Sequence, residues 1–315
     1  MPAYPFRPSE LAHTFSVVAR DPATGQLGVA VQSHWFCVGR EVCWAEAGVG
    51  AVATQSLVKV SYGPLGLDRM RQGLTAAQAL ADLLAADEGR ELRQVAMVDA
   101  RGQVAAHTGQ RCMAAVGHEV GDAFSVQANI MATAEVWPAM AGAYRTARGD
   151  LADRLLAALD AAQAAGGDLR GKQSAALLIV SAQRCAEPWA GVRVDLRVDD
   201  HPEPLAELRR LLTVHRAYEH MNAGDDLLGQ SRVEEALVEY RTAAQMAPDI
   251  PELPFWHAVT LADIGRVGEA LPLFRTVFAA DPNLATLVER LPASGLLHAG
   301  PPTLARILQC RGSTS

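Results

Sequence analysis

The sequence lacks the features that mark membrane-spanning and nucleic-acid-binding proteins. None of its 315 residues lie in an uninterrupted apolar run of about 18 residues, roughly the length that a membrane-spanning helix needs. The net charge is -7 and the basic residues are scattered, whereas nucleic-acid binding depends on clustered lysine and arginine. We therefore expect neither a membrane nor a nucleic acid among the partners. The first residues also lack the apolar core of a signal peptide, which predicts a cytoplasmic location.

Paired cysteines and the common cofactor motifs are missing as well. The five cysteines are odd in number and never form a C-x-x-C pair, so we expect reduced thiols. The sequence contains no phosphate-binding loop, G-x-S-x-G elbow, H-E-x-x-H pair or dinucleotide fingerprint. No cofactor and no metal ion are therefore predicted.

A repeat in the C-terminal third is the strongest internal pattern. Hydrophobic residues make up 50% of the chain, and its length favours two domains. Six positions recur after a spacing of 34 residues. They are Val233, Glu235, Ala236, Leu237, Tyr240 and Pro248, matched by Val267, Glu269, Ala270, Leu271, Phe274 and Pro282. The pattern predicts helices over about 215–229 and 232–246, with a second such pair behind them.

This segment resembles the tetratricopeptide repeat (TPR) over residues 215–284. Small Ala236 and Ala270 would let paired helices approach, and Tyr240 and Phe274 would fill the space between repeats. The resemblance leaves two functions open, a groove for a protein partner and a packing or self-association appendage. If the segment is a packing or self-association appendage, we expect a homo-oligomer.

The N-terminal two thirds read as hairpins and blocks of helices. Two β-branched runs joined by the turn PATGQ predict a hairpin that starts at Thr14, and GVGAVATQS predicts a third strand. One helix is expected over 64–87, and a second hairpin is expected around Asp99 to Gly102. Alanine-rich helices over 133–147 and 150–165, further strands, and a short helix after His201 complete the pattern. We predict an α+β class with antiparallel sheets covered by helices.

Six segments of this region resemble a known bacterial family. They are TFSVVARDPATGQLGVAVQS, GVGAVATQS, VDARGQVAAHTG, VQANIM, GKQSAALLIV and VDLRVDDHPEPLAELRRL. Together they resemble the Ntn-hydrolase-like proteins catalogued as domain of unknown function 1028, over about residues 13–212. The resemblance implies a four-layer αββα sandwich over 14–212, preceded by an extension over 1–13 and followed by the repeat domain over 213–315.

The resemblance also implies a nucleophile. In N-terminal-nucleophile (Ntn) hydrolases the residue that opens the first strand attacks the substrate, and its own α-amine takes the proton, a role suited to a pKa of about 7.7–8. Thr14 is the matching residue. Because residues 1–13 precede it, its amine is free only after the His13–Thr14 bond is cut. An ordinary strand residue is the alternative interpretation of Thr14.

Other polar residues lie where a substrate would meet such a site. Ser33 is expected to support the nucleophile and His34 to contact substrate, while Asn129 is expected to donate its amide to an oxyanion. Gln55 is expected to act similarly on the substrate. For His34 a surface turn is the alternative, and neither Arg40 nor Lys59 is assigned as a cation near the nucleophile.

A charged group follows the last predicted strand. Alternation along a strand would put Arg197, Asp199 and His201 on one face and Asp200 on the other. The first three residues would orient a polar substrate or hold a divalent cation. The alternative is an internal salt bridge and a helix N-cap.

Two functions remain open at this point. The first is an Ntn-type hydrolase that cleaves an amide bond in a small molecule or peptide through Thr14. The second is a non-catalytic module that binds a small ligand or a protein, with the repeats used for assembly.

Overall fold

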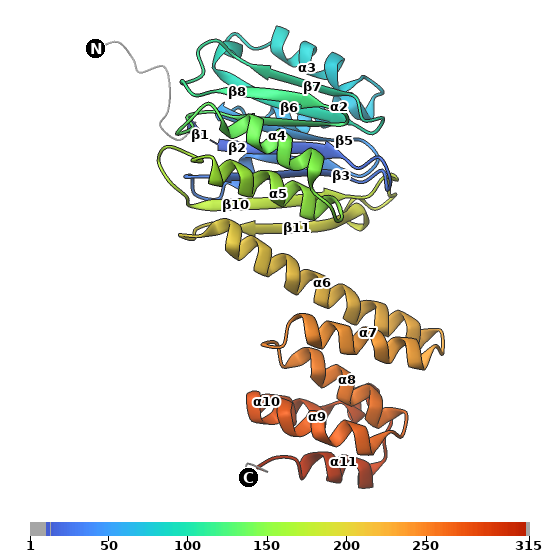
Figure 1. Ribbon diagram of the computed structural model, residues 1–315. Coiled ribbons are helices and arrows are strands. Elements are labelled where there is room, and N and C mark those ends of the chain that lie inside the picture. The colour runs from blue at the N-terminus through green and yellow to red at the C-terminus, as the bar shows by residue number, and fades with distance from the viewer. Residues whose placement is uncertain (1–10, 13, 313–315) are drawn as a thin grey trace, which may run out of the picture. The chain divides into compact units, whose positions relative to one another are not determined.

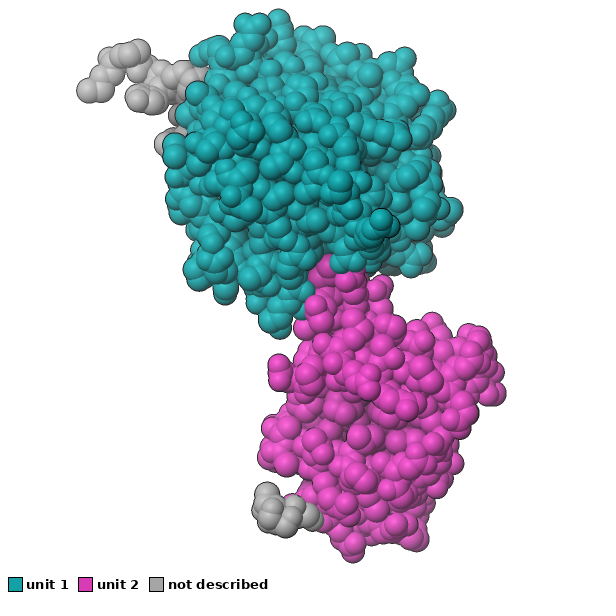
Figure 2. Space-filling model, viewed as in Figure 1, with its two compact units in different colours: residues 1–210 teal, residues 211–315 magenta. Residues whose placement is uncertain are grey.

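The computed structural model describes residues 11–12 and 14–312. The chain forms two compact units, residues 1–210 (unit 1) and residues 211–315 (unit 2), coloured separately in Figure 2. Helix α6 (Pro204–Gly229) contains the boundary between them. Each unit is described by itself below.

Unit 1 contains two antiparallel sheets (Figure 1). Sheet A has the strand order β1 (Leu11–Ala12), β5 (Gly50–Leu57), β6 (Arg93–Asp99) and β7 (Val104–Thr108), and β4 (Cys43–Glu46) also pairs with β5. Sheet B has the order β11 (Val192–Val198), β10 (Ser174–Val180), β3 (Leu27–Ser33), β2 (Thr14–Arg20), β9 (Phe124–Ala128) and β8 (Gly117–Gly121). Strands β2 and β5 contact each other across the space between the two sheets.

Helices cover the outer faces of both sheets. Helices α2 (Tyr62–Arg71) and α3 (Ala76–Ala85) pack on sheet A, and α4 (Val136–Thr146) and α5 (Leu151–Ala164) pack on sheet B. The remaining short elements of unit 1 are α1 (Val38–Val42), η2 (Arg90–Leu92) and η3 (Pro188–Gly191). Strands covered on both faces should be apolar throughout. Strand β2 is buried from Thr14 to Ala19, so the polar residues it carries need internal partners.

Half of the space between the sheets is apolar. Val18, Val29 and Val31 of sheet B meet Ala51 and Ala53 of sheet A in a single buried cluster. The other half, toward the start of β2, is polar and holds the candidate site described below.

Several predicted boundaries are wrong. The helix expected over 64–87 is two helices, because Thr75 and Gln78 form a capping box that starts α3 anew. Strands β4 and β8 were not predicted, since neither shows the long β-branched pattern that marks a strand. The short helix expected after His201 and the first repeat helix are one continuous α6, which begins at Pro204, a residue tolerated in a first helical turn.

Unit 2 is helical. After α6 it contains α7 (Val233–Met246), α8 (Glu252–Asp263), α9 (Val267–Ala280), α10 (Asn283–Arg290), η4 (Pro292–Ser294) and α11 (Pro301–Leu308). Ala236, Tyr240, Ala270 and Phe274 lie in its core and are almost completely buried. The predicted mixed α+β class with antiparallel sheets and a helical C-terminal region is confirmed. None of the helices in the described part of the chain is long and apolar enough to span a bilayer.

Candidate functional site

Thr14 is the first residue of β2 and is fully buried. The antiparallel register places it opposite Ser33, the last residue of β3. Its Oγ1 hydroxyl donates a hydrogen bond of 3.2 Å to Oγ of Ser33. The structure therefore brings together the two hydroxyl residues that the sequence nominated.

The carbonyl oxygen of Thr14 accepts three hydrogen bonds. The backbone N–H of Asn129 donates at 3.1 Å, Nε2 of Gln55 at 3.0 Å and Nδ2 of Asn129 at 3.3 Å. Asn129 and Gln55 are fully buried. Since burying an unpaired amide is costly, these contacts hold the backbone of Thr14 in a defined position. Asn129 and Gln55 thus lie against the nucleophile candidate itself.

Gln94 of β6 joins both amides and was not among the residues selected from sequence. Its Oε1 accepts from Gln55 Nε2 at 2.7 Å and from Asn129 Nδ2 at 3.0 Å. Its side chain is fully buried. The available signal was a glutamine directly before the apolar run VAMV of the strand RQVAMVD, where an unpaired side-chain amide would be destabilising.

His34 lies beside these residues but is exposed. Its backbone N–H donates to Oδ2 of Asp168 at 3.1 Å. The side chain of Asp168 is completely buried and forms an ion pair of 2.8 Å with Arg170. The turn that follows Ser33 is therefore anchored through its backbone, while the imidazole of His34 stays accessible.

Arg197, Asp199 and His201 are not brought to Thr14. Strand β11 is the edge of sheet B, separated from β2 by β10 and β3. It ends at Val198, so the predicted alternation does not continue through Asp199 and His201. Arg197 pairs instead with Asp195 at 3.1 Å.

The residues after β11 contact both their own turn and neighbouring segments. Nδ1 of His201 accepts the backbone N–H of Glu203 at 3.0 Å. Oδ1 of Asp200 accepts from Gln173, just before β10, at 3.1 Å. The backbone carbonyl of Asp199 accepts from the N–H of Cys37, which follows β3, at 3.1 Å. The turn that leads into α6 is therefore held against the segments before β10 and after β3.

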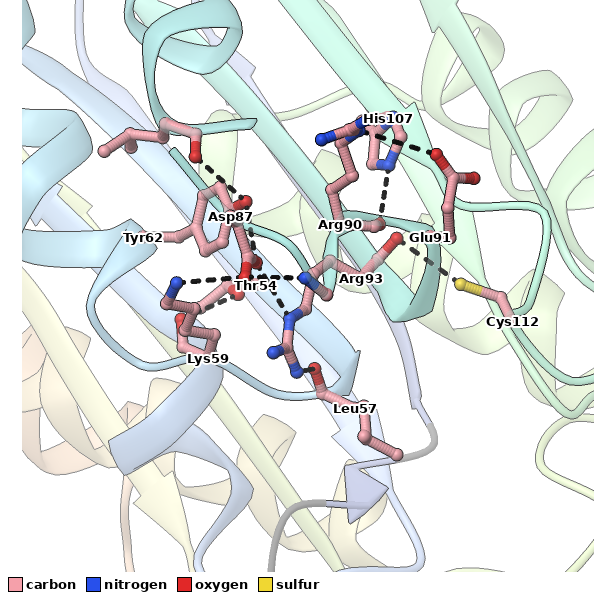
Figure 3. A network of polar contacts seen from close by, with 12 residues as sticks. Thr54, Leu57, Lys59, Tyr62, Asp87, Arg90, Glu91, Arg93, His107 and Cys112 are labelled. Carbon is pink, nitrogen blue, oxygen red and sulfur yellow. Dashed lines mark hydrogen bonds and ion pairs between the residues drawn. The ribbon is translucent and has the colours of Figure 1, made fainter. Parts of the chain in front are cut away.

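A second polar cluster surrounds Asp87 (Figure 3). The carboxylate lies 3.1 Å from Nζ of Lys59 and 3.1 Å from Nε of Arg93, and it accepts from the Tyr62 hydroxyl at 3.1 Å. Burial alone would raise the pKa of Asp87, but hydrogen bonds from Arg93 and Lys59 bring it below its ordinary value. Burial and the nearby Asp87 carboxylate raise the pKa of Tyr62. Lys59 thus has its own carboxylate partner.

The described residues show no group of three or more His, Cys, Asp or Glu side chains that could hold a metal ion. The described cysteines are all free thiols. What the site offers is a buried hydroxyl next to neutral amides and hydroxyls, an arrangement suited to positioning a nucleophile.

Comparison with known proteins gives a family. The model described as a family of unknown function (DUF1028) matches residues 14–208. A solved structure of the same family, protein SPO2555 from Silicibacter pomeroyi, is 32% identical with a TM-score of 0.58, over 64% of this chain and 85% of that chain. Anbu, the ancestral beta-subunit from Yersinia bercovieri, is 11% identical with a TM-score of 0.32, over 62% of this chain and 92% of that chain, a similarity too low to support an inference. No curated protein matches. The chain belongs to the family of unknown function DUF1028.

Proposed function

We propose that unit 1 is an Ntn-type hydrolase with an αββα sandwich, and that it cleaves an amide bond in a small molecule or peptide through Thr14. The observation that carries the proposal is the position of Thr14. Thr14 is the first residue of β2, its hydroxyl is hydrogen-bonded to Ser33, and its carbonyl oxygen accepts hydrogen bonds from Asn129 and Gln55. The order of helices, sheets and helices in unit 1 supports the same assignment.

The proposed chemistry needs only groups of Thr14 and water. The hydroxyl oxygen of Thr14 attacks the substrate carbonyl carbon, and the α-amine takes the hydroxyl proton. The carbon–nitrogen bond of the substrate then breaks, the leaving amine takes that proton, and an ester to Thr14 remains. Water hydrolyses the ester, which releases the acid and restores the hydroxyl. An α-amine with a pKa of about 7.7–8 can act as this base near neutral pH.

Removal of residues 1–13 is part of the proposal, because a peptide nitrogen cannot act as the base. Strand β1 pairs with β5 in sheet A, and β2 lies in sheet B. The chain therefore passes from one sheet to the other between Ala12 and Thr14. The family match begins at Thr14, which supports a mature chain that starts there.

The surrounding residues take different proposed roles. Ser33 accepts the hydroxyl hydrogen of Thr14 and orients its oxygen. Both amide hydrogens of Asn129 have acceptors, Thr14 and Gln94, so we assign Asn129 and Gln55 to positioning Thr14. His34, exposed beside Ser33, is the proposed substrate contact. Arg197, Asp199 and His201 are left with their contacts to Asp195, Cys37 and Glu203.

Intact-mass measurement and N-terminal sequencing of the protein from its natural source test this proposal. A chain that begins at Thr14, together with release of an amine from an amide substrate, is the expected result. A chain that retains residues 1–13 and cleaves no amide would overturn it and favour the non-catalytic binding module.

For unit 2 we propose a pair of TPR-like repeats that binds a protein partner. Its supporting observation is a groove of about 630 Å³ within unit 2, lined by Tyr240, Trp256, Val259 and Leu296 among others. Leu296 is 56% exposed. If the groove instead joins two copies of this chain, light scattering will show a dimer that Leu296→Arg converts to a monomer. A wild-type monomer would exclude self-association and leave the groove to another protein.

A further inference from the structure

A continuous series of side-chain hydrogen bonds crosses the space between the two sheets. We name it the amide–hydroxyl chain, and its members in order are Ser125, Gln127, Ser16, Gln55, Gln94, Thr108 and His118. The successive distances are 3.0, 2.7, 2.5, 2.7, 3.0 and 2.8 Å. The amide–hydroxyl chain contacts the Thr14 carbonyl through Gln55 and ends at the exposed His118.

Backbone carbonyls fix the direction of the bonds from Gln55 to Gln94 and from Gln94 to Thr108. A carbonyl oxygen can only accept, and Gln55 Nε2 also contacts the Thr14 carbonyl at 3.0 Å. Gln94 Nε2 likewise contacts the carbonyls of Gly117 and Ala128, each at 3.1 Å. Both amide groups are therefore oriented. Gln55 donates to Gln94, and Gln94 Nε2 shares its two hydrogens among Thr108 Oγ1 and the two carbonyls.

The bond between Thr108 and His118 takes its direction from the protonation of the imidazole. Thr108 Oγ1 accepts from Gln94, and its single hydrogen is available for Nδ1 of His118 at 2.8 Å. We assign Nδ1 as the acceptor, which corresponds to a neutral His118 that carries its proton on Nε2. Protonation of Nδ1 would remove this acceptor and force the Thr108 hydroxyl to turn.

The surroundings of His118 favour the neutral form. Burial lowers the pKa of His118, and the nearby His107 lowers it further. The elements packed on β8 are β7, β9 and α4. Their titratable groups are His107 of β7 and Tyr144 and Arg145 of α4, while Glu119 of β8 itself forms an ion pair with Arg145. Gly117 faces α4 through Trp137, so by strand alternation Glu119 faces α4 as well and His118 faces sheet A.

We infer that His118 is a positioning residue for Thr14. As a neutral acceptor it orients the Thr108 hydroxyl, which is one of the three acceptors of Gln94 Nε2, and Gln94 Oε1 holds the two amides that bind the Thr14 carbonyl. Hydrogen bonds in such a series polarise one another, so a change at the exposed end is transmitted to the buried end. The consequence for reaction rate rests on the proposed function, whereas the coupling of His118 to Thr14 does not.

Nuclear magnetic resonance tests the coupling without any substrate. With threonine methyl groups and histidine rings labelled, the Thr14 methyl signal should titrate at the pKa of His118 in the wild type. This response should vanish in His118→Asn, which keeps an acceptor oxygen in place of Nδ1 but does not titrate. Thr108→Val should raise the pKa of His118 by removing the donor to its neutral form. His298→Asn in unit 2 and Thr146→Val on α4 are matched controls that should change neither signal.

A rate measurement tests the consequence. The probe is a β-lactone, whose ring opens when the Thr14 hydroxyl forms an ester, and the readout is the rise in intact mass. Acylation should slow as pH falls, and His118→Asn should remove one of the two groups that titrate in the acid limb, the α-amine being the other. His118→Phe, which has no acceptor, should react about tenfold more slowly at all pH values, the factor expected for one lost hydrogen bond.

The outcomes separate the two proposals. A Thr14 methyl signal that does not change as His118 titrates in the folded wild type would overturn the inference, whether or not the protein reacts with the β-lactone. A Thr14 signal that follows His118 in a protein that no β-lactone acylates would retain the coupling and overturn the hydrolase. Equal acid limbs in wild type and His118→Asn would also contradict the positioning role.

Discussion

Two polar clusters lie on opposite faces of sheet A. They differ in how their buried polar groups are compensated, by ion pairs in one and by hydrogen bonds between neutral groups in the other. Arg93 and Gln94 are consecutive on β6, so their side chains point to opposite faces. Arg93 enters the charged Asp87 cluster, where Lys59 keeps 40% of its side chain exposed. Gln94 enters the amide–hydroxyl chain, which is fully buried from Ser125 to Gln94 and whose titratable member is His118 at the exposed end.

The comparison shows why a nucleophile in this position would depend on its own amine. Charges far from water are strongly destabilising unless paired, and neutral amides and hydroxyls are tolerated when every group has a partner. In the described part of the chain, side chains of Ser33, Gln55 and Asn129 hydrogen-bond to Thr14, and none of these three can act as a base. The free α-amine supplies the missing base in the proposed mechanism.

The charged cluster gives the largest expected loss of stability. Asp87→Asn leaves Arg93 and Lys59 without their carboxylate and should lower the free energy of unfolding by about 3 kcal/mol at neutral pH. The pKa of Asp87 is lowered in the folded protein, so its stabilisation is present above the ordinary value of 3.8 and is lost as pH falls through the folded value. Wild type and variant should therefore converge in acid.

Urea unfolding at neutral and acidic pH measures this effect. The exposed Asp122→Asn is the matched control and should change little at either pH. An Asp87→Asn deficit that persists unchanged in strong acid would show that the carboxylate charge is not what stabilises the cluster.

A substitution in the amide–hydroxyl chain should lower the free energy of unfolding by less than Asp87→Asn does. This loss should not disappear in acid as the loss from Asp87→Asn does. Gln94→Leu keeps the volume but removes the acceptor for Gln55 and Asn129, which should cost about 2 kcal/mol. Met97→Leu, buried on the same strand, is the control and should cost less than about 1.5 kcal/mol. Chemical denaturation of the two variants measures the difference. A Gln94→Leu protein as stable as wild type would mean that the amide–hydroxyl chain does not contribute to the stability of the fold.

Removal of a helix N-cap outside both clusters should give the smallest loss in the free energy of unfolding. Thr75→Ala removes the capping box of α3 and should cost about 1 kcal/mol. Because Thr75 contacts neither cluster, the loss should be the same in acid and at neutral pH, and the reaction of Thr14 should be unaffected. A thermal melt and the β-lactone assay measure both quantities. A changed acylation rate would mean that any loss of stability disturbs the site.

Local signals predicted much of the fold, and long-range pairing explains the rest. The hairpins β2–β3 and β6–β7 were predicted because each has a clear turn between β-branched runs. Strand β8 was missed, because GHEVG is short and half exposed and forms only by pairing with β9. The continuity of α6 was not predicted, because the short helix after His201 and the helix over 215–229 were assigned from separate patterns, whereas one helix runs from Pro204 to Gly229.

The site was predictable only in part for the same reason. Thr14, Ser33, Gln55 and Asn129 were selected from sequence, and the sheets bring them together. Gln94, Thr108 and His118 were not selected, because their importance comes from sheet A stacking on sheet B, which no local pattern encodes. Arg197 was also selected, but strand order could not be read from the chain, and β11 is an edge strand separated from β2 by β10 and β3, so its substrate contact stays a prediction.

The most direct test of the central claim is the intact mass of the purified protein before and after incubation with a β-lactone, with peptide mapping of any adduct. The account predicts a chain that starts at Thr14 and gains one adduct on that residue, with no adduct in Thr14→Ala. A wild-type chain that retains residues 1–13, or an adduct that persists in Thr14→Ala, would contradict it.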